Sequence, residues 1–210
     1  MIILEDVCKD FKKESVIKHV TATFETGKIT GIIGRNGCGK TVLFKMICGL
    51  MVPTSGKITV NDEVIGKDVD FPSGIGTIIE TPAFLGINSG LETLMELASI
   101  QKKIGKKEVI ATLEKVGLDP KSKKKAGKYS LGMRQRLGIA QAIMENPDTL
   151  ILDEPMNGLD KAGVKEMREL FFELKKQQKT ILIASHNKDD IDILCDEVYE
   201  MDNGVLTKLR

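Results

Sequence analysis

A glycine-rich stretch has the composition of a phosphate-binding loop. Gly34-Arg35-Asn36-Gly37-Cys38-Gly39-Lys40-Thr41 matches the pattern GxxxxGK[ST], between an apolar run typical of a strand and residues 42–50, which predict a helix. Glycines let the backbone curl so that several N–H groups face one anion, and the following helix adds the positive end of its dipole. Lys40 can then reach the β- and γ-phosphates, and the Thr41 hydroxyl can bind Mg²⁺. The expected phosphate-binding residues are Gly34, Arg35, Asn36, Gly37, Cys38 through its amide, Gly39, Lys40, Thr41 and Val42.

Two acidic residues follow a second apolar run. Residues 150–152 predict a buried strand, and Asp153 and Glu154 come directly after it. Asp153 is placed to hold Mg²⁺ through water, because this cation prefers oxygen ligands and keeps much of its hydration shell. Glu154 could polarise the water that attacks the terminal phosphate. We expect Pro155 to restrict Glu154 to extended backbone conformations; an ordinary acid pair at a strand end is the structural alternative.

A histidine follows a third apolar run. Residues 180–184 predict a strand, and Ser185 and His186 come next. An isolated histidine is more often structural, but the position directly after a buried strand favours a functional role. Its imidazole could hydrogen-bond the terminal phosphate or the attacking water. Lys40, Glu154 and His186 are therefore the expected catalytic residues.

The elements that carry these residues alternate between strand and helix patterns, which predicts an α/β fold with a mostly parallel core sheet. The apolar runs 28–33, 149–152 and 180–184 are the expected central strands. Ligands of such sheets bind beyond the carboxyl ends of the strands, so the three polar loops should converge in space.

Other segments predict antiparallel structure and a helical insert. The N-terminal strand, residues 20–24 and residues 57–64 form an expected antiparallel β subdomain, with a turn at Asn61-Asp62. The Asp202-Asn203-Gly204 turn joins a C-terminal hairpin. Amphipathic patterns at 91–100 and 108–117 predict an inserted helical subdomain over about 83–128.

Composition limits the class of protein. The chain has 210 residues and a formal charge of +1, which fits one domain and provides no general attraction to nucleic acid. No run is apolar enough to span a bilayer, and the start, MIILEDVCKDF, is not a secretory signal, so we expect a cytosolic location. Four scattered cysteines favour reduced thiols over a zinc site or disulfides. Ten lysines within 102–128 predict a solvated surface or, as the alternative, contact with an anionic partner.

The ordered set GRNGCGKT, YSLGMRQR, LILDEP, NGLD and ASH resembles the ATP-binding cassette of ABC transporters over essentially the whole chain. The resemblance implies the P-loop NTPase fold of ABC ATPases, with residues 1–210 as one ATP-binding domain. Residues 83–128 and the start of 129–146 would form the helical subdomain. It also implies ATP and Mg²⁺ as cofactors.

In the family, two subunits enclose two ATP molecules head to tail. The segment that corresponds to residues 129–133 caps the γ-phosphate bound by the opposing subunit, which implies this role for Ser130 and Gly132; without the resemblance, Ser130 reads as a plain helix cap. By the same resemblance Asp160 belongs to a loop that crosses the dimer interface, and Phe11 stacks on adenine, although an isolated phenylalanine is more often a core residue. The chain departs from the usual LSGGQ form at Tyr129, Leu131 and Met133.

A further departure is Glu80, which lies where the family usually has a glutamine that senses Mg²⁺ and the attacking water. A carboxylate can still bind Mg²⁺, but it places a negative charge beside the triphosphate. At about 4 Å and an effective dielectric constant of about 20, one pair of unit charges is worth roughly 4 kcal/mol. The expected metal ligands are thus Thr41, Asp153 and Glu80. With Glu80 and the motif YSLGMRQR, the chain is similar to the ATP-binding subunits of exporters of bacitracin and lantibiotic peptides.

The resemblance implies an ATPase subunit that pairs with a second copy of itself and drives a membrane permease on a separate chain, from the inner face of the cell membrane. The permease would dock between the Glu80 loop and the 83–128 helices. No nucleic-acid partner is expected. The alternative is a soluble ABC ATPase acting on ribosomes or DNA. An ATP-binding regulator without catalysis is disfavoured because Glu154 and His186 are present.

Overall fold

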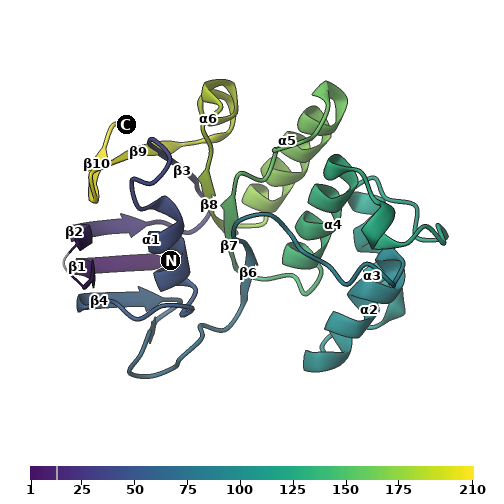
Figure 1. Cartoon of the computed structure of the whole chain (residues 1–210), viewed down its shortest axis with the longest axis horizontal. Coiled ribbons are helices and arrows are strands. Elements are labelled where there is room, and N and C mark those ends of the chain that lie inside the picture. Colours follow the sequence, from purple (N-terminus) through teal and green to yellow (C-terminus); the bar gives the residue numbers. More distant parts are fainter. Residues whose placement is uncertain (13) are drawn as a thin grey trace.

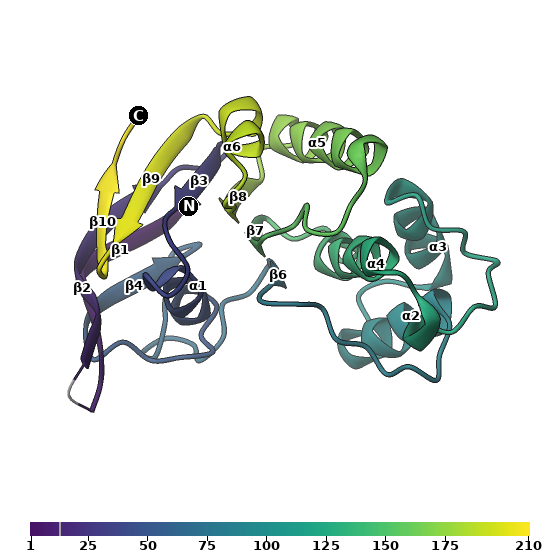
Figure 2. The same ribbon diagram turned by 45° about the horizontal axis from the view of Figure 1, so that its top comes forward.

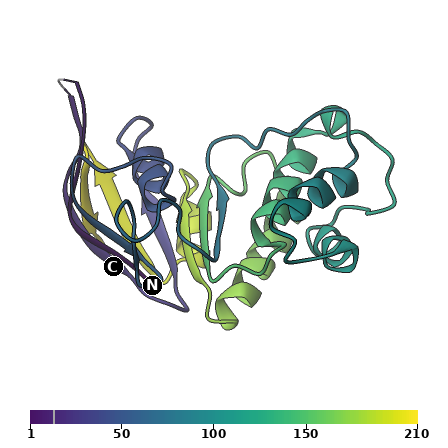
Figure 3. The ribbon, with the colours of Figure 1, turned by 90° about the horizontal axis from the view of Figure 1, so that it is seen from below.

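The computed structural model describes residues 1–12 and 14–210. Two sheets lie at one end of an elongated molecule and a group of helices lies at the other (Figure 1; Figure 3).

The larger sheet has six strands in the order β10-β9-β3-β8-β7-β6, which Figure 2 shows following one another across the molecule. The pairings of β9 with β3, β3 with β8, β8 with β7 and β7 with β6 are parallel, and the hairpin of β9 and β10 is antiparallel. The strands are β3 (Ile29–Ile33), β6 (Ile75–Ile78), β7 (Thr149–Asp153), β8 (Thr180–Ala184), β9 (Glu197–Asp202) and β10 (Val205–Lys208).

The smaller sheet is antiparallel, in the order β2-β1-β4-β5. Helix α1 (Lys40–Ile47) is buried between the two sheets, where Phe44 packs in one cluster with Ile2 of β1 and Ile151 of β7. The helix that follows the glycine-rich loop is therefore held from both sides. The strands of this sheet are β1 (Ile2–Phe11), β2 (Glu14–Phe24), β4 (Ser55–Val60) and β5 (Glu63–Val64).

The parallel sheet buries both of its faces, because successive side chains of a strand point to opposite sides. Ile151 of β7 faces α1, whereas its neighbours Leu150 and Leu152 join the cluster on the other side. That second face is covered by α5 (Lys161–Lys176) and α6 (Lys188–Leu194), which contribute Phe171 and Ile191 to the cluster.

Three helices form the other end of the molecule: α2 (Gly90–Gln101), α3 (Lys106–Lys115) and α4 (Leu131–Ile143), with the one-turn helix η1 (Ala126–Lys128) before α4. Leu94, Val109 and Leu137, one from each helix, are buried in a shared cluster. Helix α2 begins at a capping box in which Ser89 Oγ accepts the Glu92 N–H and the Glu92 carboxylate accepts the Ser89 N–H.

Most predicted elements are confirmed. The runs 28–33, 149–152 and 180–184 form β3, β7 and β8, and both expected turns occur, with positive φ at Asn61 and Asp62 and at Asn203 and Gly204. The expected C-terminal hairpin is confirmed as β9 and β10, and β9 also pairs in parallel with β3, which was not predicted. The elements β6, α5 and α6 were not predicted from the sequence.

The part of the chain that the structure describes contains no helix long and apolar enough to cross a membrane. All four cysteines are free thiols. Burial raises the pKa of Cys48 and Cys195 to about 12, so these two thiols stay protonated at neutral pH.

Candidate functional site

The three polar loops converge, as expected for loops that follow the carboxyl ends of parallel strands. Thr41 Oγ1, at the start of α1, donates a hydrogen bond of 2.8 Å to Asp153 Oδ2 at the end of β7. His186 Nδ1, just beyond β8, lies 2.9 Å from Glu154 Oε1. Residues far apart in the sequence thus meet at one edge of the parallel sheet.

The glycine-rich loop bends tightly around the amine of Lys40. This side chain is 8% exposed, and its Nζ donates to the carbonyl oxygens of Gly34 at 2.7 Å and Arg35 at 3.1 Å. Gly34 has a φ of 151°, and a Cβ there would collide with the Met201 carbonyl, so only glycine fits. A cation and the N-terminus of α1 therefore lie together, which suits an anionic phosphate chain.

Backbone contacts from two directions hold Glu154. Its N–H donates to the Ala184 carbonyl at 2.9 Å, and its own carbonyl accepts the Gln135 side-chain amide at 3.2 Å. Its φ is 50°, so the expectation that Pro155 would keep it extended was wrong; these two bonds hold the left-handed conformation instead. The Glu154 carboxylate also accepts the His186 backbone N–H at 3.0 Å. Its direction is thus set before any substrate binds.

The oxygen donors of this region fit Mg²⁺. Asp153 is 8% exposed, its carboxylate meets the Thr41 hydroxyl, and Glu80 lines the same cavity. Within the described residues, no group of three or more His, Cys, Asp or Glu side chains could hold a metal by itself. This is compatible with Mg²⁺, which is commonly held by one or two carboxylates together with substrate phosphates and water.

Glu80 has a partner that the sequence analysis missed. Its Oε1 lies 2.6 Å from Lys45 Nζ on α1, and its backbone φ is 62°. The ammonium group offsets the negative charge that Glu80 brings toward the phosphate loop. Lysines are common on the chain's surface, so nothing in the spacing of residues 45 and 80 could have identified the pair.

A cavity of about 410 Å³ opens where these groups meet. Gln135 and Asn157 also line it. Both lie within motifs quoted in the sequence analysis, YSLGMRQR and NGLD, but neither residue was given a role there. The lining residues are Val16, Asn36, Gly37, Gly39, Lys40, Thr41, Val42, Glu80, Thr81, Leu131, Gln135, Asp153, Glu154 and Asn157.

Eight of the predicted residues do not line this cavity: Phe11, Gly34, Arg35, Cys38, Ser130, Gly132, Asp160 and His186. Gly34, Arg35 and His186 line a different pocket. Phe11 is exposed at the end of β1, with Lys9 Nζ 5.2 Å from its ring centroid. Ser130 Oγ caps α4 by accepting the Met133 N–H, and Asp160 Oδ1 caps α5 by accepting the Gly163 N–H. Gly132 packs close to the Gly158 carbonyl. Ser130 and Gly132 therefore do not complete the cavity of their own chain.

Known proteins are similar to this chain in sequence. The model of the family described as "ABC transporter" matches residues 17–157. The chain is 42% identical to the uncharacterized ABC transporter ATP-binding protein YybJ of Bacillus subtilis, over 98% of this chain and 94% of YybJ. It is 41% identical to the bacitracin transport ATP-binding protein BcrA of Bacillus licheniformis, over 96% of this chain and 66% of BcrA.

A solved structure has the same fold. The dimeric ATP-binding cassette MJ0796, in a post-hydrolysis state bound to ADP and Pi, superposes with a TM-score of 0.88. The match covers 100% of this chain and 99% of that one, at 23% sequence identity. At this identity the likeness concerns the fold alone.

Proposed function

The chain belongs to the ABC transporter ATP-binding family and hydrolyses ATP, and from this premise we propose that two copies close head to tail around two Mg·ATP to drive a separate permease. One observation carries the proposal. Lys40, Thr41, Asp153 and Glu154 line one cavity, whereas Ser130 and Gly132 lie outside it, at the start of α4. Leu131, between them, reaches the cavity, but in the proposed dimer Ser130 and Gly132 would cap the phosphate bound by the second copy.

In the proposed reaction, the oxygen of a water bonds to the γ-phosphorus while the bond from that phosphorus to the bridging oxygen breaks, which yields ADP and phosphate. Glu154 receives the proton of this water, because its carboxylate is already aimed by the His186 N–H. Lys40 and His186 stabilise the charge on the γ-phosphate.

Thr41 and Asp153 would hold Mg²⁺, with Glu80 as a further oxygen donor. The bound cation would neutralise charge on the β- and γ-phosphates. Phe11 would stack on adenine. Asp160 would lie near the dimer interface, where its loop faces the second copy.

A second groove supports docking of the permease. It has a volume of about 570 Å³ and lies between β6, the end of α1 and the ends of α2 and α4. Phe71 and Ile100 line it and are 64% and 74% exposed, and Leu50 adds a third exposed apolar side chain. Exposed apolar surface of this kind marks interaction sites. We propose that the permease docks at this groove. The docking place expected from the sequence was different, between the Glu80 loop and the 83–128 helices.

The similarity to BcrA, whose name specifies bacitracin transport, supports a peptide antibiotic as the exported substrate. The subunit would then act at the inner face of the cell membrane. In this proposal residues 1–210 work as one ATP-binding domain.

The test is Glu154→Gln. The amide keeps its size but cannot accept the proton, so we expect turnover to fall by about 100-fold or more while ATP still binds. ATP should then trap a dimer, measured by size-exclusion chromatography with light scattering. Glu169→Gln, an exposed change on α5, is the matched control and should leave turnover unchanged. Full turnover of the Glu154→Gln variant would contradict the assigned role.

The trapped variant also tests the partner. With ATP present, Glu154→Gln should recover a polytopic membrane protein from detergent-solubilised membranes of the source cell. Phe71→Asp in the same bait should abolish this recovery, whereas Ile193→Asp, an equally apolar exposed position on α6, should not. Recovery of ribosomes or DNA-associated proteins would instead support the soluble alternative.

A further inference from the structure

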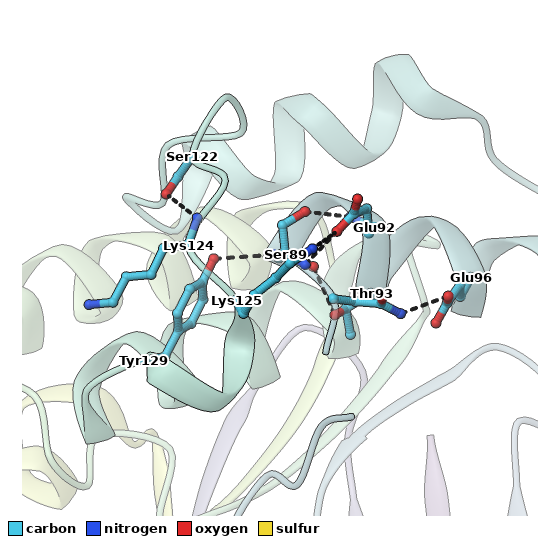
Figure 4. Close-up of polar contacts among 10 residues, drawn as sticks. Ser89, Glu92, Thr93, Glu96, Ser122, Lys124, Lys125 and Tyr129 are labelled. Atoms are coloured by element: carbon cyan, nitrogen blue, oxygen red, sulfur yellow. Dashed lines mark hydrogen bonds and ion pairs between the residues drawn. The ribbon is translucent and has the colours of Figure 1, made fainter. Parts of the chain in front are cut away.

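Tyr129 differs from the leucine that is usual at this position, and the structure gives its hydroxyl a partner. The residue is 5% exposed, between η1 and α4, and its ring packs among the apolar side chains of the helical end. Its hydroxyl oxygen accepts the backbone N–H of Gly90 at 3.2 Å, in a buried position. Figure 4 shows the ring pointing from the α4 side toward Ser89 and the start of α2. A leucine could fill the space but could not make this bond.

The Gly90 N–H, which donates to the Tyr129 hydroxyl, has no hydrogen-bond partner within α2 itself. The first four N–H groups of a helix have no partner within it. Ser89 Oγ accepts the N–H of Glu92, and the Tyr129 hydroxyl accepts that of Gly90. A Cβ at position 90 would lie 2.7 Å from the Tyr129 oxygen, so the glycine is what allows the approach. One N–H at the start of α2 is therefore paired by a different segment of the chain.

Further bonds tie the same two segments together. The Ala126 N–H donates to the Asn88 carbonyl at 2.7 Å, and Lys125 Nζ lies 3.1 Å from a carboxylate oxygen of Glu92 (Figure 4). Ser89 and Lys125 also pair as an isolated antiparallel bridge. Residues 125–129 are thus fastened to the start of α2 at several points, of which the Tyr129 bond is nearest to Ser130.

The backbone of Tyr129 is fixed as well. Its carbonyl accepts a hydrogen bond from Arg134 Nη1 at 2.7 Å, and the next residue, Ser130, caps α4. The side chain of Tyr129 is held by α2 and its main chain by α4. Tyr129 is therefore held at its hydroxyl and at its carbonyl, directly before Ser130.

We propose that Tyr129 is a positioning residue for ATP-driven closure: its hydroxyl bond to Gly90 places Ser130 and Gly132 where they can meet the phosphate bound by the second copy. The inference rests on the proposed function, because it requires the head-to-tail dimer. It adds a role for a residue that touches neither ATP nor the reacting atoms.

The test is Tyr129→Phe, which removes only the hydroxyl. In the Glu154→Gln background, we expect the dissociation constant of the ATP-trapped dimer to rise about tenfold, the equivalent of one lost hydrogen bond. ATP binding to the monomer should not change, because the phosphate loop is untouched. The matched control is Tyr199→Phe, the same change at the only other tyrosine of the chain, which lies against Phe24 in the opposite half of the molecule.

Hydrogen exchange provides an independent readout. In Tyr129→Phe, peptides covering 88–92 and 130–134 should exchange faster, while Tyr199→Phe leaves both unchanged. Dimerisation equal to that of Glu154→Gln alone, or an equal loss in the Tyr199→Phe control, would overturn the proposal. If the Glu154→Gln variant does not dimerise with ATP, the proposed function is wrong. The role of Tyr129 is tested separately: unchanged hydrogen exchange of residues 130–134 in Tyr129→Phe would refute it.

Discussion

In the ion pair of Lys45 and Glu80, the lysine compensates the negative charge of the glutamate. A carboxylate in the place of a glutamine adds a charge beside the phosphate loop, and the sequence analysis expected a bound cation to compensate it. The structure adds a second source of positive charge, with 2.6 Å between Lys45 Nζ and Glu80 Oε1. Both groups are partly exposed, so solvent screens the pair and its energy is at most about 1 kcal/mol.

We expect Lys45→Gln to weaken ATP binding about threefold, because Glu80 is then left uncompensated near the phosphates. The effect should be larger in EDTA than with Mg²⁺, since the metal offers Glu80 another positive partner. Fluorescent ATP titration under both conditions measures this.

Two further variants separate charge from structure. Adding Glu80→Gln to Lys45→Gln should restore ATP binding, and Lys176→Gln, an exposed change on α5, should have no effect. An effect of Lys45→Gln that persists in the double variant would exclude the compensation.

At the scale of elements, the start of α2 joins local capping to long-range contacts. The pKa of Glu92 is lowered to about 2, first by the Ser89 backbone N–H, then by the Ser89 side chain and by Lys125. Its carboxylate thus favours the folded state whenever it is ionised. A lowered pKa contributes stability that is complete above the ordinary value of 4.5 and is lost as the pH falls toward 2.

We therefore expect Glu92→Gln to lower the melting temperature at pH 7, with the difference from the unmodified chain narrowing as the pH falls below 4.5. Thermal unfolding followed by circular dichroism at several pH values gives both curves. Glu114→Gln, an exposed change on α3, should show no such pH-dependent difference. A constant difference between pH 7 and pH 3 would rule out the ionised cap as its source.

At the scale of the whole molecule, the helical end is joined to the sheets where α4 passes over β6. Gly76 of β6 lies so close to α4 that a Cβ would collide with the Ala142 carbonyl. The backbone φ of Gly76 is not positive, so close packing rather than conformation requires the glycine. This contact sets how near α4, which carries Ser130, can lie to the strand before Glu80.

Gly76→Ala should lower the free energy of unfolding by about 1–3 kcal/mol, because the added methyl group meets backbone that cannot move freely. Urea denaturation measures the change. Gly105→Ala is the control, since a Cβ there has room beside Glu108. Equal stability of the two variants would show that the backbone around Gly76 and Ala142 shifts to accommodate the methyl group.

The sequence by itself determined the parts that depend on local geometry. A phosphate loop needs glycines at set spacings, and a strand end needs a buried apolar run followed by polar groups. The loop 34–41, the pair Asp153 and Glu154, His186 and the three central strands were therefore predictable, as was their convergence. Two turns were equally clear, because few residues tolerate positive φ.

Only the tertiary structure decided the contacts between segments distant in the sequence. It paired Lys45 with Glu80, placed the Gln135 amide on the Glu154 carbonyl, and joined the Tyr129 hydroxyl to Gly90. It also placed β9 beside β3 in the parallel sheet, and it overrode one local expectation, since Glu154 has a positive φ. A side chain's partner depends on which segments packing brings together, whereas spacing along the chain describes only what lies within a turn or two of the same element.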